Sequence, residues 1–272
     1  MIRKHLIRLT TGFIFGGITT WAIFGFSLFM FLILLTVLMS LTSYEWVRLA
    51  KPNMRLSIAC VAYITITILA TIAAVTYIPL ITLSISLLLW LWISRITFKP
   101  QKQLAFLAEP KLMLPLGIML FVPLWMGMIM LKSYSANALF YIIMLVCMSD
   151  VGAYFVGSHY GKRKLCPSIS PGKTIEGLIG GLIIGFATGM IVSYFLPFTL
   201  GIGQYLILTL MSIFILFISS VGDLFESLLK RLCSVKDSSN LLPGHGGALD
   251  RLDSLLAGVP IFVLCCILLG WM

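Results

Sequence analysis

The chain has 272 residues, of which 60% are hydrophobic and 10% charged, and its formal net charge is +10. Soluble domains carry roughly 25% charged residues, so this composition excludes a water-soluble globular protein. The basic excess favours the cytoplasmic loops of a membrane protein over nucleic-acid binding. The six cysteines lack metal-type spacing and fall mostly in apolar runs, so neither a disulfide nor a zinc site is expected.

Apolar runs close to the length of a membrane span recur along the whole chain. We expect an all-α, polytopic integral membrane protein with about nine transmembrane helices and a polar cleft facing the cytoplasm. The predicted spans are Leu9–Trp21, Phe24–Tyr44, Leu56–Ile78, Leu80–Ile93, Leu112–Leu131, Leu139–Val156, Gly177–Leu196, Tyr205–Val221 and Leu255–Trp271. One long tilted helix in place of the first two is the alternative. The basic N-terminus lacks a clear cleavage site, which predicts an uncleaved first span.

Several spans carry features that predict local structure. Pro79 is expected to end the third span, and Trp90 and Trp92 are expected to be interfacial anchors of the fourth. A short surface helix is expected around Leu104–Ala108, and the eighth span is expected to continue as a helix through Arg231. Glycines in the seventh span predict close helix packing. They are Gly177, Gly180, Gly181, Gly185 and Gly189.

The basic residues test the topology through the positive-inside rule. With the N-terminus inside, the inward loops are 1–8, 45–55, 94–111, 157–176 and 222–254. These loops contain every lysine and arginine except Lys132, and eight of the nine acidic residues. Merging the first two runs would move the N-terminal basic cluster to the outside. The count therefore favours nine spans, with the polar residues on the cytoplasmic side.

Asp150 lies within the sixth predicted span, where an ionised carboxylate is costly unless it is hydrated or faces the protein interior. One interpretation is a solvated carboxylate at the helix end. The other, which we favour, is a residue that lines a polar cleft.

The loop S-I-S-P-G-K-T-I-E-G follows at residues 168–177. Ser170 or Thr174 is expected to cap the seventh helix, with Glu176 in its first turn. Free backbone N–H groups, hydroxyls and the Lys173 ammonium also suit a phosphate site. The glycine spacing of a Walker A loop is absent, and this pattern alone is weakly specific.

The most polar stretch of the chain follows the eighth span. Asp223, Glu226, Ser227, Lys230 and Arg231 share one face of a helix at i, i+3, i+4, i+7 and i+8.

A second carboxylate pair follows in the same stretch. Asp250 and Asp253 repeat the i, i+3 spacing at the expected start of the ninth helix. Two such pairs suggest a Mg²⁺ site that engages substrate phosphates, whereas surface ion pairs are the alternative for either pair alone. Three glycines around His245 (Gly244, Gly246 and Gly247) would let the backbone approach a ligand.

These residues resemble the signature of the CDP-diacylglycerol synthases, also called phosphatidate cytidylyltransferases, in their compact bacterial form. The matching elements are Ser227-x-x-Lys230-Arg231, Lys236-Asp237, Pro243-x-His245-Gly246-Gly247 and Asp250-Arg251-x-Asp253-Ser254, together with Ser170-Pro171-x-Lys173-Thr174-x-Glu176-Gly177, Gly222-Asp223-Leu224-x-Glu226-Ser227 and Asp150…Gly152-Ala153-Tyr154. Ala248 and Gly172 depart from the usual family pattern, but neither is a plausible ligand. The motifs cover the C-terminal half, and the N-terminal half adds only hydropathy.

The resemblance implies that CTP and phosphatidic acid react to give CDP-diacylglycerol and pyrophosphate, in phospholipid biosynthesis. It implies one membrane domain over residues 1–272, with N-terminal helices at 1–135 and catalytic helices at 136–272. The implied metal is Mg²⁺, with K⁺ as a candidate second cation. The implied metal ligands are Asp223, Asp250 and Asp253, with Asp150 and Glu226 as additional candidates. The implied catalytic residues are Asp223, Asp250, Lys230 and Arg231. The implied substrate-binding residues are Ser170, Lys173, Thr174, Ser227, Lys236, His245, Gly246, Gly247 and Arg251.

The resemblance also implies a location and partners, and two alternative functions remain. The expected location is the bacterial inner membrane, with a multi-pass chain and the site on the cytoplasmic side. The expected partners are CTP, phosphatidic acid and membrane lipids, without nucleic acid, and a homodimer is expected from the family alone. One rival is a CTP-dependent polyprenol or phytol kinase. A rival of another class is an ion-coupled transporter, which would carry charges near the membrane midplane rather than at one face.

Overall fold

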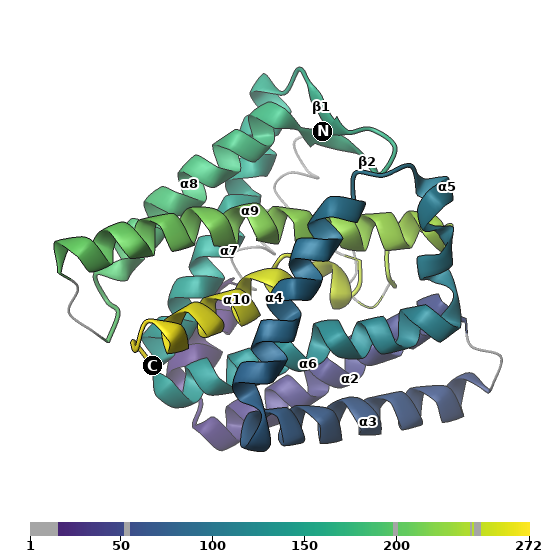
Figure 1. The fold of residues 1–272 in the computed structure, drawn as a ribbon. Helices are drawn as coiled ribbons and strands as arrows, with labels where there is room; N and C mark the ends of the chain where they lie inside the picture. Colours follow the sequence, from purple (N-terminus) through teal and green to yellow (C-terminus); the bar gives the residue numbers. More distant parts are fainter. Residues whose placement is uncertain (1–15, 52–54, 198–200, 240, 242–245) are drawn as a thin grey trace.

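The computed structural model describes residues 16–51, 55–197, 201–239, 241 and 246–272. Seven helices in these ranges are long and apolar enough to cross a membrane. They are α2 (Leu28–Ala50), α3 (Leu56–Tyr77), α4 (Pro79–Ile96), α6 (Pro110–Tyr134), α7 (Ala136–Tyr160), α8 (Ile175–Ser193) and α9 (Ile202–Leu232), shown in Figure 1. The all-α membrane class expected from the sequence is confirmed.

The count of nine spans stays a prediction. Residues 16–25 are helical, but much of the predicted first run, Leu9–Trp21, lies outside the described residues. The chain leaves the helix before α2, where the Ser27 hydroxyl accepts a hydrogen bond from the Met30 N–H (3.3 Å). This break agrees with two separate helices rather than one long helix.

The predicted last span, Leu255–Trp271, contains a shorter helix. This helix, α10 (Leu255–Leu268), has 14 residues. A helix of that length covers about 21 Å, less than the roughly 30 Å hydrocarbon core. Nearly all of α10 is buried, and it packs against α4, α6, α7 and α9. α10 is therefore a central core element of the fold.

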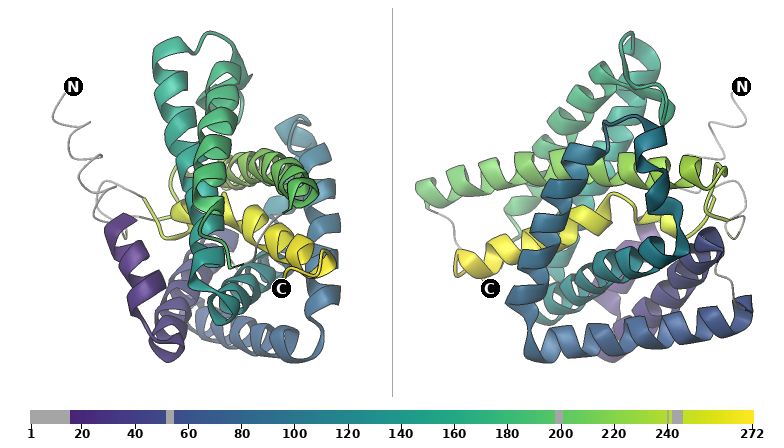
Figure 2. Two further views of the ribbon diagram at one scale, coloured as in Figure 1. Left: turned by 90° about the vertical axis from the view of Figure 1, so that its left-hand side faces the viewer. Right: turned by 45° about the vertical axis from the view of Figure 1, so that its right-hand side comes forward.

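Helices α7 and α8 lie side by side in all views (Figures 1 and 2). The predicted role of the glycines in α8 is confirmed. A Cβ added at Gly180 would lie 2.4 Å from the Cβ of Val156, and one at Gly181 would lie 2.7 Å from the Ser149 carbonyl oxygen. Only glycine lets the two helix backbones approach this closely.

A two-stranded antiparallel hairpin joins α7 to α8, where the sequence predicted only a loop. It pairs β1 (Lys164–Cys166) with β2 (Ser170–Thr174). Of the two cap candidates, Thr174 caps α8, since its hydroxyl accepts from the Gly177 N–H at 3.1 Å. The Glu176 carboxylate accepts from the Lys162 and Arg163 N–H groups and pairs with the Arg163 guanidinium. These contacts hold the hairpin over the start of α8.

The N-terminal helices pack beside α6 and α9. The Trp46 indole N–H on α2 donates to the Met113 carbonyl on α6 at 2.8 Å. The interfacial role expected for Trp90 is wrong, because its side chain is buried edge-on against Phe225 of α9. Positions 90 and 92 lie about 200° apart around a helix, so only Trp92 faces outward.

Two predictions about the connections between spans are confirmed. The third span ends before Pro79, where α4 begins. The short helical segment expected around Leu104–Ala108 is formed by α5 (Gln101–Leu104) and η1 (Ala105–Ala108).

The placement of Asp250 and Asp253 on one face of the last helix is wrong. Asp250 lies in the short 3₁₀ segment η2 (Leu249–Arg251), and Asp253 lies in the turn before α10. The Asp253 carboxylate accepts from the Ser254 N–H at 2.8 Å. Such local bonds from an aspartate to the backbone compete with regular helix, which explains why α10 begins only at Leu255.

Candidate active site

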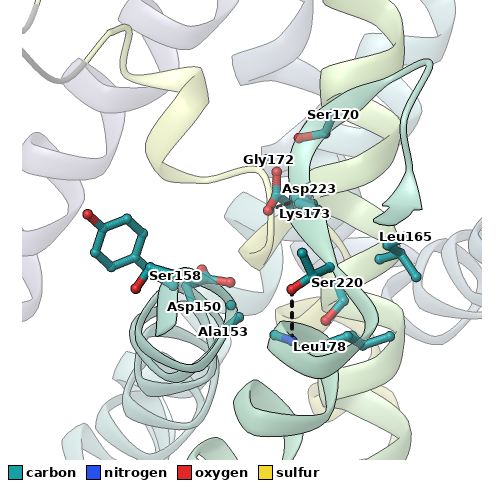
Figure 3. A pocket seen from close by; sticks show the side chains of 14 residues that line it. Asp150, Ala153, Ser158, Leu165, Ser170, Gly172, Lys173, Leu178, Ser220 and Asp223 are labelled. Carbon is teal, nitrogen blue, oxygen red and sulfur yellow. Dashed lines mark hydrogen bonds and ion pairs between the residues drawn. The ribbon is translucent and has the colours of Figure 1, made fainter. Parts of the chain in front are cut away.

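A cavity of about 390 Å³ lies among α7, β2, α8 and α9. Its polar lining includes Asp150, Ser170, Lys173 and Asp223, and its apolar lining includes Ala153, Leu165 and Leu178. Figure 3 shows these side chains around the space from separate elements. The cavity thus joins a charged end to an apolar wall, as a site for an amphipathic ligand requires.

The charged end is built around an ion pair. The Lys173 ammonium on β2 lies 2.5 Å from Oδ2 of Asp223 on α9, and each side chain is 27% exposed. The hairpin carries Lys173 over the polar stripe of α9. Both residues were expected at a site, but their direct pairing was not.

Two further carboxylates surround this pair. Asp150 on α7 lines the cavity and is exposed to it, and its Oδ1 lies 3.4 Å from the Ser254 hydroxyl. This agrees with the interpretation of Asp150 as a cleft-lining residue. A Cβ at Gly222 would lie only 2.8 Å from the Asp253 carbonyl, so a glycine is needed for the Asp253 turn to rest on α9. Burial raises the pKa of Asp253 well above its usual value, and repulsion from Asp223, Glu226 and Asp150 raises it further.

A second ionic cluster is centred on Lys230. Its ammonium lies 2.5 Å from Oε2 of Glu226 and 2.5 Å from Oδ1 of Asp250. Apart from this ion pair, neither Glu226 oxygen has a hydrogen-bond partner among the described residues. All three groups are largely buried. This arrangement holds the Lys230 ammonium between two carboxylates.

Asp250 is also bound by the loop that precedes it. Its Oδ2 accepts from the N–H groups of Gly247 (2.7 Å) and Ser238 (3.1 Å). Burial raises the pKa of Asp250, but the Lys230 ammonium and these N–H groups outweigh burial and hold it below its usual value. Gly246 has φ +78°, and a Cβ there would lie 2.5 Å from the same Oδ2. Only glycine fits this turn.

The remaining predicted site residues are not part of the two ion-pair clusters described above. Arg231 donates to the carbonyls of Ile169 (3.2 Å) and Val235 (3.1 Å), so its guanidinium ties the hairpin to the end of α9. Ser227 is half-buried on α9. Lys236 and Arg251 are exposed, and His245 lies outside the described residues.

The donor set fits a hard divalent cation, although the ligands are not gathered at one point. Across the described ranges, no three histidine, cysteine or acidic side chains converge closely enough to hold a metal ion. Five carboxylates nevertheless interact within this region, against the basic groups of Lys173, Lys230 and Arg251. They belong to Asp150, Asp223, Glu226, Asp250 and Asp253. Carboxylate oxygens in excess of basic groups suit Mg²⁺.

Sequence reasoning missed one buried residue near the site. Glu45 was expected in a polar connection, but it lies within α2 and is 0% exposed. Its carboxylate binds the loop that carries Asp250. The only sequence signal was an acidic residue at the end of an apolar run.

Fold and cavity together define an integral membrane protein with a charged site beside apolar walls. The Cytidylyltransferase family model matches residues 6–269. A phosphatidate cytidylyltransferase of Pseudomonas aeruginosa is 35% identical over 246 residues, which cover 89% of each chain. The chain therefore belongs to the cytidylyltransferase family, in agreement with the resemblance seen in the sequence.

Two further relatives match over a shorter stretch. A phosphatidate cytidylyltransferase of Haemophilus influenzae is 50% identical over 128 residues, 46% of this chain and 43% of the relative. One of Bacillus subtilis is 45% identical over 130 residues, 48% of this chain and 47% of the relative. These two matches thus cover less than half the length of each relative.

Proposed function

We propose that this protein is a phosphatidate cytidylyltransferase. In the reaction, a phosphate oxygen of phosphatidate attacks the α-phosphorus of CTP. A new P–O bond forms, the bond between the α-phosphorus and its bridging oxygen breaks, and pyrophosphate leaves with that electron pair. The products are CDP-diacylglycerol and pyrophosphate. The phosphate nucleophile is already anionic, so positioning and charge neutralisation carry the catalysis.

The observation that carries this proposal is the Lys173–Asp223 pair at the charged end of a cavity with apolar walls. A lipid phosphate can place its headgroup beside Lys173 and the Ser170 hydroxyl while its glycerol carbons contact Leu165 and Leu178. The cavity volume of about 390 Å³ suits a headgroup rather than a whole lipid. The acyl chains would then remain in the bilayer.

We assign Lys230 and its carboxylate partners to the part of the site that binds the nucleotide. The ammonium, held between Glu226 and Asp250, is proposed to donate a hydrogen bond to a nucleotide phosphate from a fixed position. Ser227 lies one turn before Lys230 and supplies a hydroxyl donor on the same helix. Lys236, Arg251 and the His245–Gly247 segment are proposed to contact substrate phosphates.

We propose that Mg²⁺ binds among Asp223, Asp250 and Asp253, with K⁺ as a candidate second cation. When bound, Mg²⁺ neutralises phosphate charge and assists departure of pyrophosphate. The excess of carboxylates over basic groups supports this assignment.

The proposed location is the bacterial inner membrane, with the site on the cytoplasmic side, where CTP is available. The loops that carry the basic residues support this orientation. We also propose a homodimer on the basis of the family alone.

The function is tested with purified protein, Mg²⁺ and CTP labelled either in the α- or in the γ-phosphate. With phosphatidate, the α-label should enter the lipid fraction and the γ-label should leave as pyrophosphate. A CTP-dependent polyprenol or phytol kinase would instead transfer the γ-label to its alcohol. Label in lipid from γ-CTP, or none from α-CTP with phosphatidate, would contradict the proposal.

A further inference from the structure

Glu45 is a buried carboxylate in the N-terminal half of the chain. It lies on α2, is 0% exposed and accepts four hydrogen bonds. Two come from the hydroxyls of Ser238 (3.0 Å) and Ser239 (2.5 Å), and two come from the N–H groups of Ala248 (2.9 Å) and Leu249 (2.8 Å). A buried carboxylate is costly unless hydrogen bonds compensate it, and these four do so.

The four donors belong to the two ends of one loop. Ser238 lies 193 positions from Glu45 in the sequence, and Leu249 immediately precedes Asp250. The Ser238 hydroxyl also lies 3.1 Å from Oδ2 of Asp250. A serine hydroxyl has one proton, so it donates to either carboxylate at a given moment. The carboxylates of Glu45 and Asp250 are therefore alternative acceptors for the same Ser238 hydroxyl.

The space around Gly247 also indicates that Glu45 packs closely against the segment that carries Asp250. A Cβ at this position would lie 2.0 Å from the Ser238 hydroxyl oxygen and 2.5 and 2.6 Å from the two Glu45 oxygens. Real Cβ atoms do not approach other atoms this closely. The Glu45 carboxylate thus fills the space that any larger residue at 247 would need.

We propose that Glu45 is a positioning residue that holds residues 238–239 and 247–250 together, so that Asp250 stays against Lys230. Glu45 reaches the site only through this loop and does not itself touch Lys230 or the 390 Å³ cavity. The structural part of the proposal stands on the contacts alone. Its effect on turnover rests on the proposed function.

The test is the Glu45→Gln variant of the full chain, which keeps the side-chain size but removes the charge. Hydrogen exchange is followed by mass spectrometry in the peptide that contains Ala248 and Leu249. The internal reference is the Lys162 and Arg163 pair of N–H groups, which another carboxylate, Glu176, holds in the same manner. We expect exchange at 248–249 to rise about tenfold or more while exchange at 162–163 is unchanged.

Turnover gives the second readout. We expect kcat of Glu45→Gln to fall about 10- to 100-fold, because misplacing a fixed catalytic group by a small distance has effects of this size. The KM for CTP should change far less. Glu109→Gln is the matched control, since Glu109 is an exposed carboxylate before α6, and it should behave as wild type. Where Glu45→Gln fails to accumulate, Gly247→Ala tests the same contact from the loop.

Three results would overturn the proposal. One is unchanged exchange at 248–249 in Glu45→Gln. Another is an equal rise at 162–163, which would mean general destabilisation. The third is a kcat within twofold of the wild-type value although hydrogen exchange at 248–249 has risen. If wild-type protein fails to turn over phosphatidate and CTP, the proposed function fails instead, and the exchange experiment still decides whether Glu45 holds the loop.

Discussion

The Lys173 ammonium on β2 lies 2.5 Å from the Asp223 carboxylate on α9. This pair joins the hairpin between α7 and α8 to the polar face of the longest helix. It lies at the charged end of the cavity in which we place the lipid phosphate. Lys173 is a proposed contact of the lipid phosphate, and Asp223 is a proposed ligand of Mg²⁺.

Replacing Lys173 by methionine should reduce lipid labelling from α-labelled CTP by about 100-fold or more, because charge stabilisation at a phosphate is lost. The control is Lys164→Met, which removes an exposed ammonium from the other strand of the same hairpin. It should retain nearly normal labelling. Equal losses in the two variants would mean that the hairpin needs positive charge in general rather than Lys173.

Asp250→Asn should lower both activity and stability. The change leaves the Lys230 ammonium with Glu226 alone in a largely buried position. Removing one partner from a buried ion pair costs about 3–5 kcal/mol. Thermal unfolding in detergent should show a clear fall in Tm beside the loss of turnover. A variant with the wild-type Tm would show that the Lys230–Asp250 contact does not stabilise the fold.

Gly180→Ala should destabilise the α7–α8 pair, because the added Cβ would meet Val156 at 2.4 Å. Overpacking of this kind costs about 1–3 kcal/mol. Gly203→Ala is the matched control, since a Cβ at that helical position meets nothing within 4 Å. It should be neutral or stabilising by up to about 1 kcal/mol. If Gly180→Ala keeps its Tm, the close approach of these helices is not essential.

Protease treatment of sealed vesicles should reveal the orientation of the hairpin. Lys162, Arg163 and Lys164 are exposed in the connection between α7 and α8. Trypsin should cut there in inside-out vesicles of the bacterial inner membrane and leave right-side-out vesicles intact at this point. The opposite pattern would reverse the proposed topology.

Hydropathy predicted the helices well because a membrane span must satisfy all of its backbone hydrogen bonds internally. Pro79 and the glycines of α8 marked real features of the fold. Hydropathy could not predict which face of an apolar helix meets protein and which meets lipid. Trp90 was therefore misassigned, although its side chain is buried against Phe225.

The polar residues around the site were also predictable, but not their partners. Asp223 and Lys173 stand 50 positions apart, and no local pattern encodes their contact. The hairpin escaped prediction because both strands are short and β2 contains proline and glycine. Glu45 was missed because its burial near a helix end depends on contacts with residues 238–239 and 248–249, which lie far away in the sequence.

The central claim is that Asp223 works at the site of cytidylyl transfer to phosphatidate. The most direct measurement is the rate of CDP-diacylglycerol formation by wild-type protein and by Asp223→Asn, with CTP, Mg²⁺ and phosphatidate. Both proteins should be matched for folded amount by thermal unfolding. We predict robust product from wild type and a loss of about 1,000-fold or more in the variant, since it removes a preorganised charge from the reacting phosphates. Near-normal turnover by folded Asp223→Asn would contradict the account.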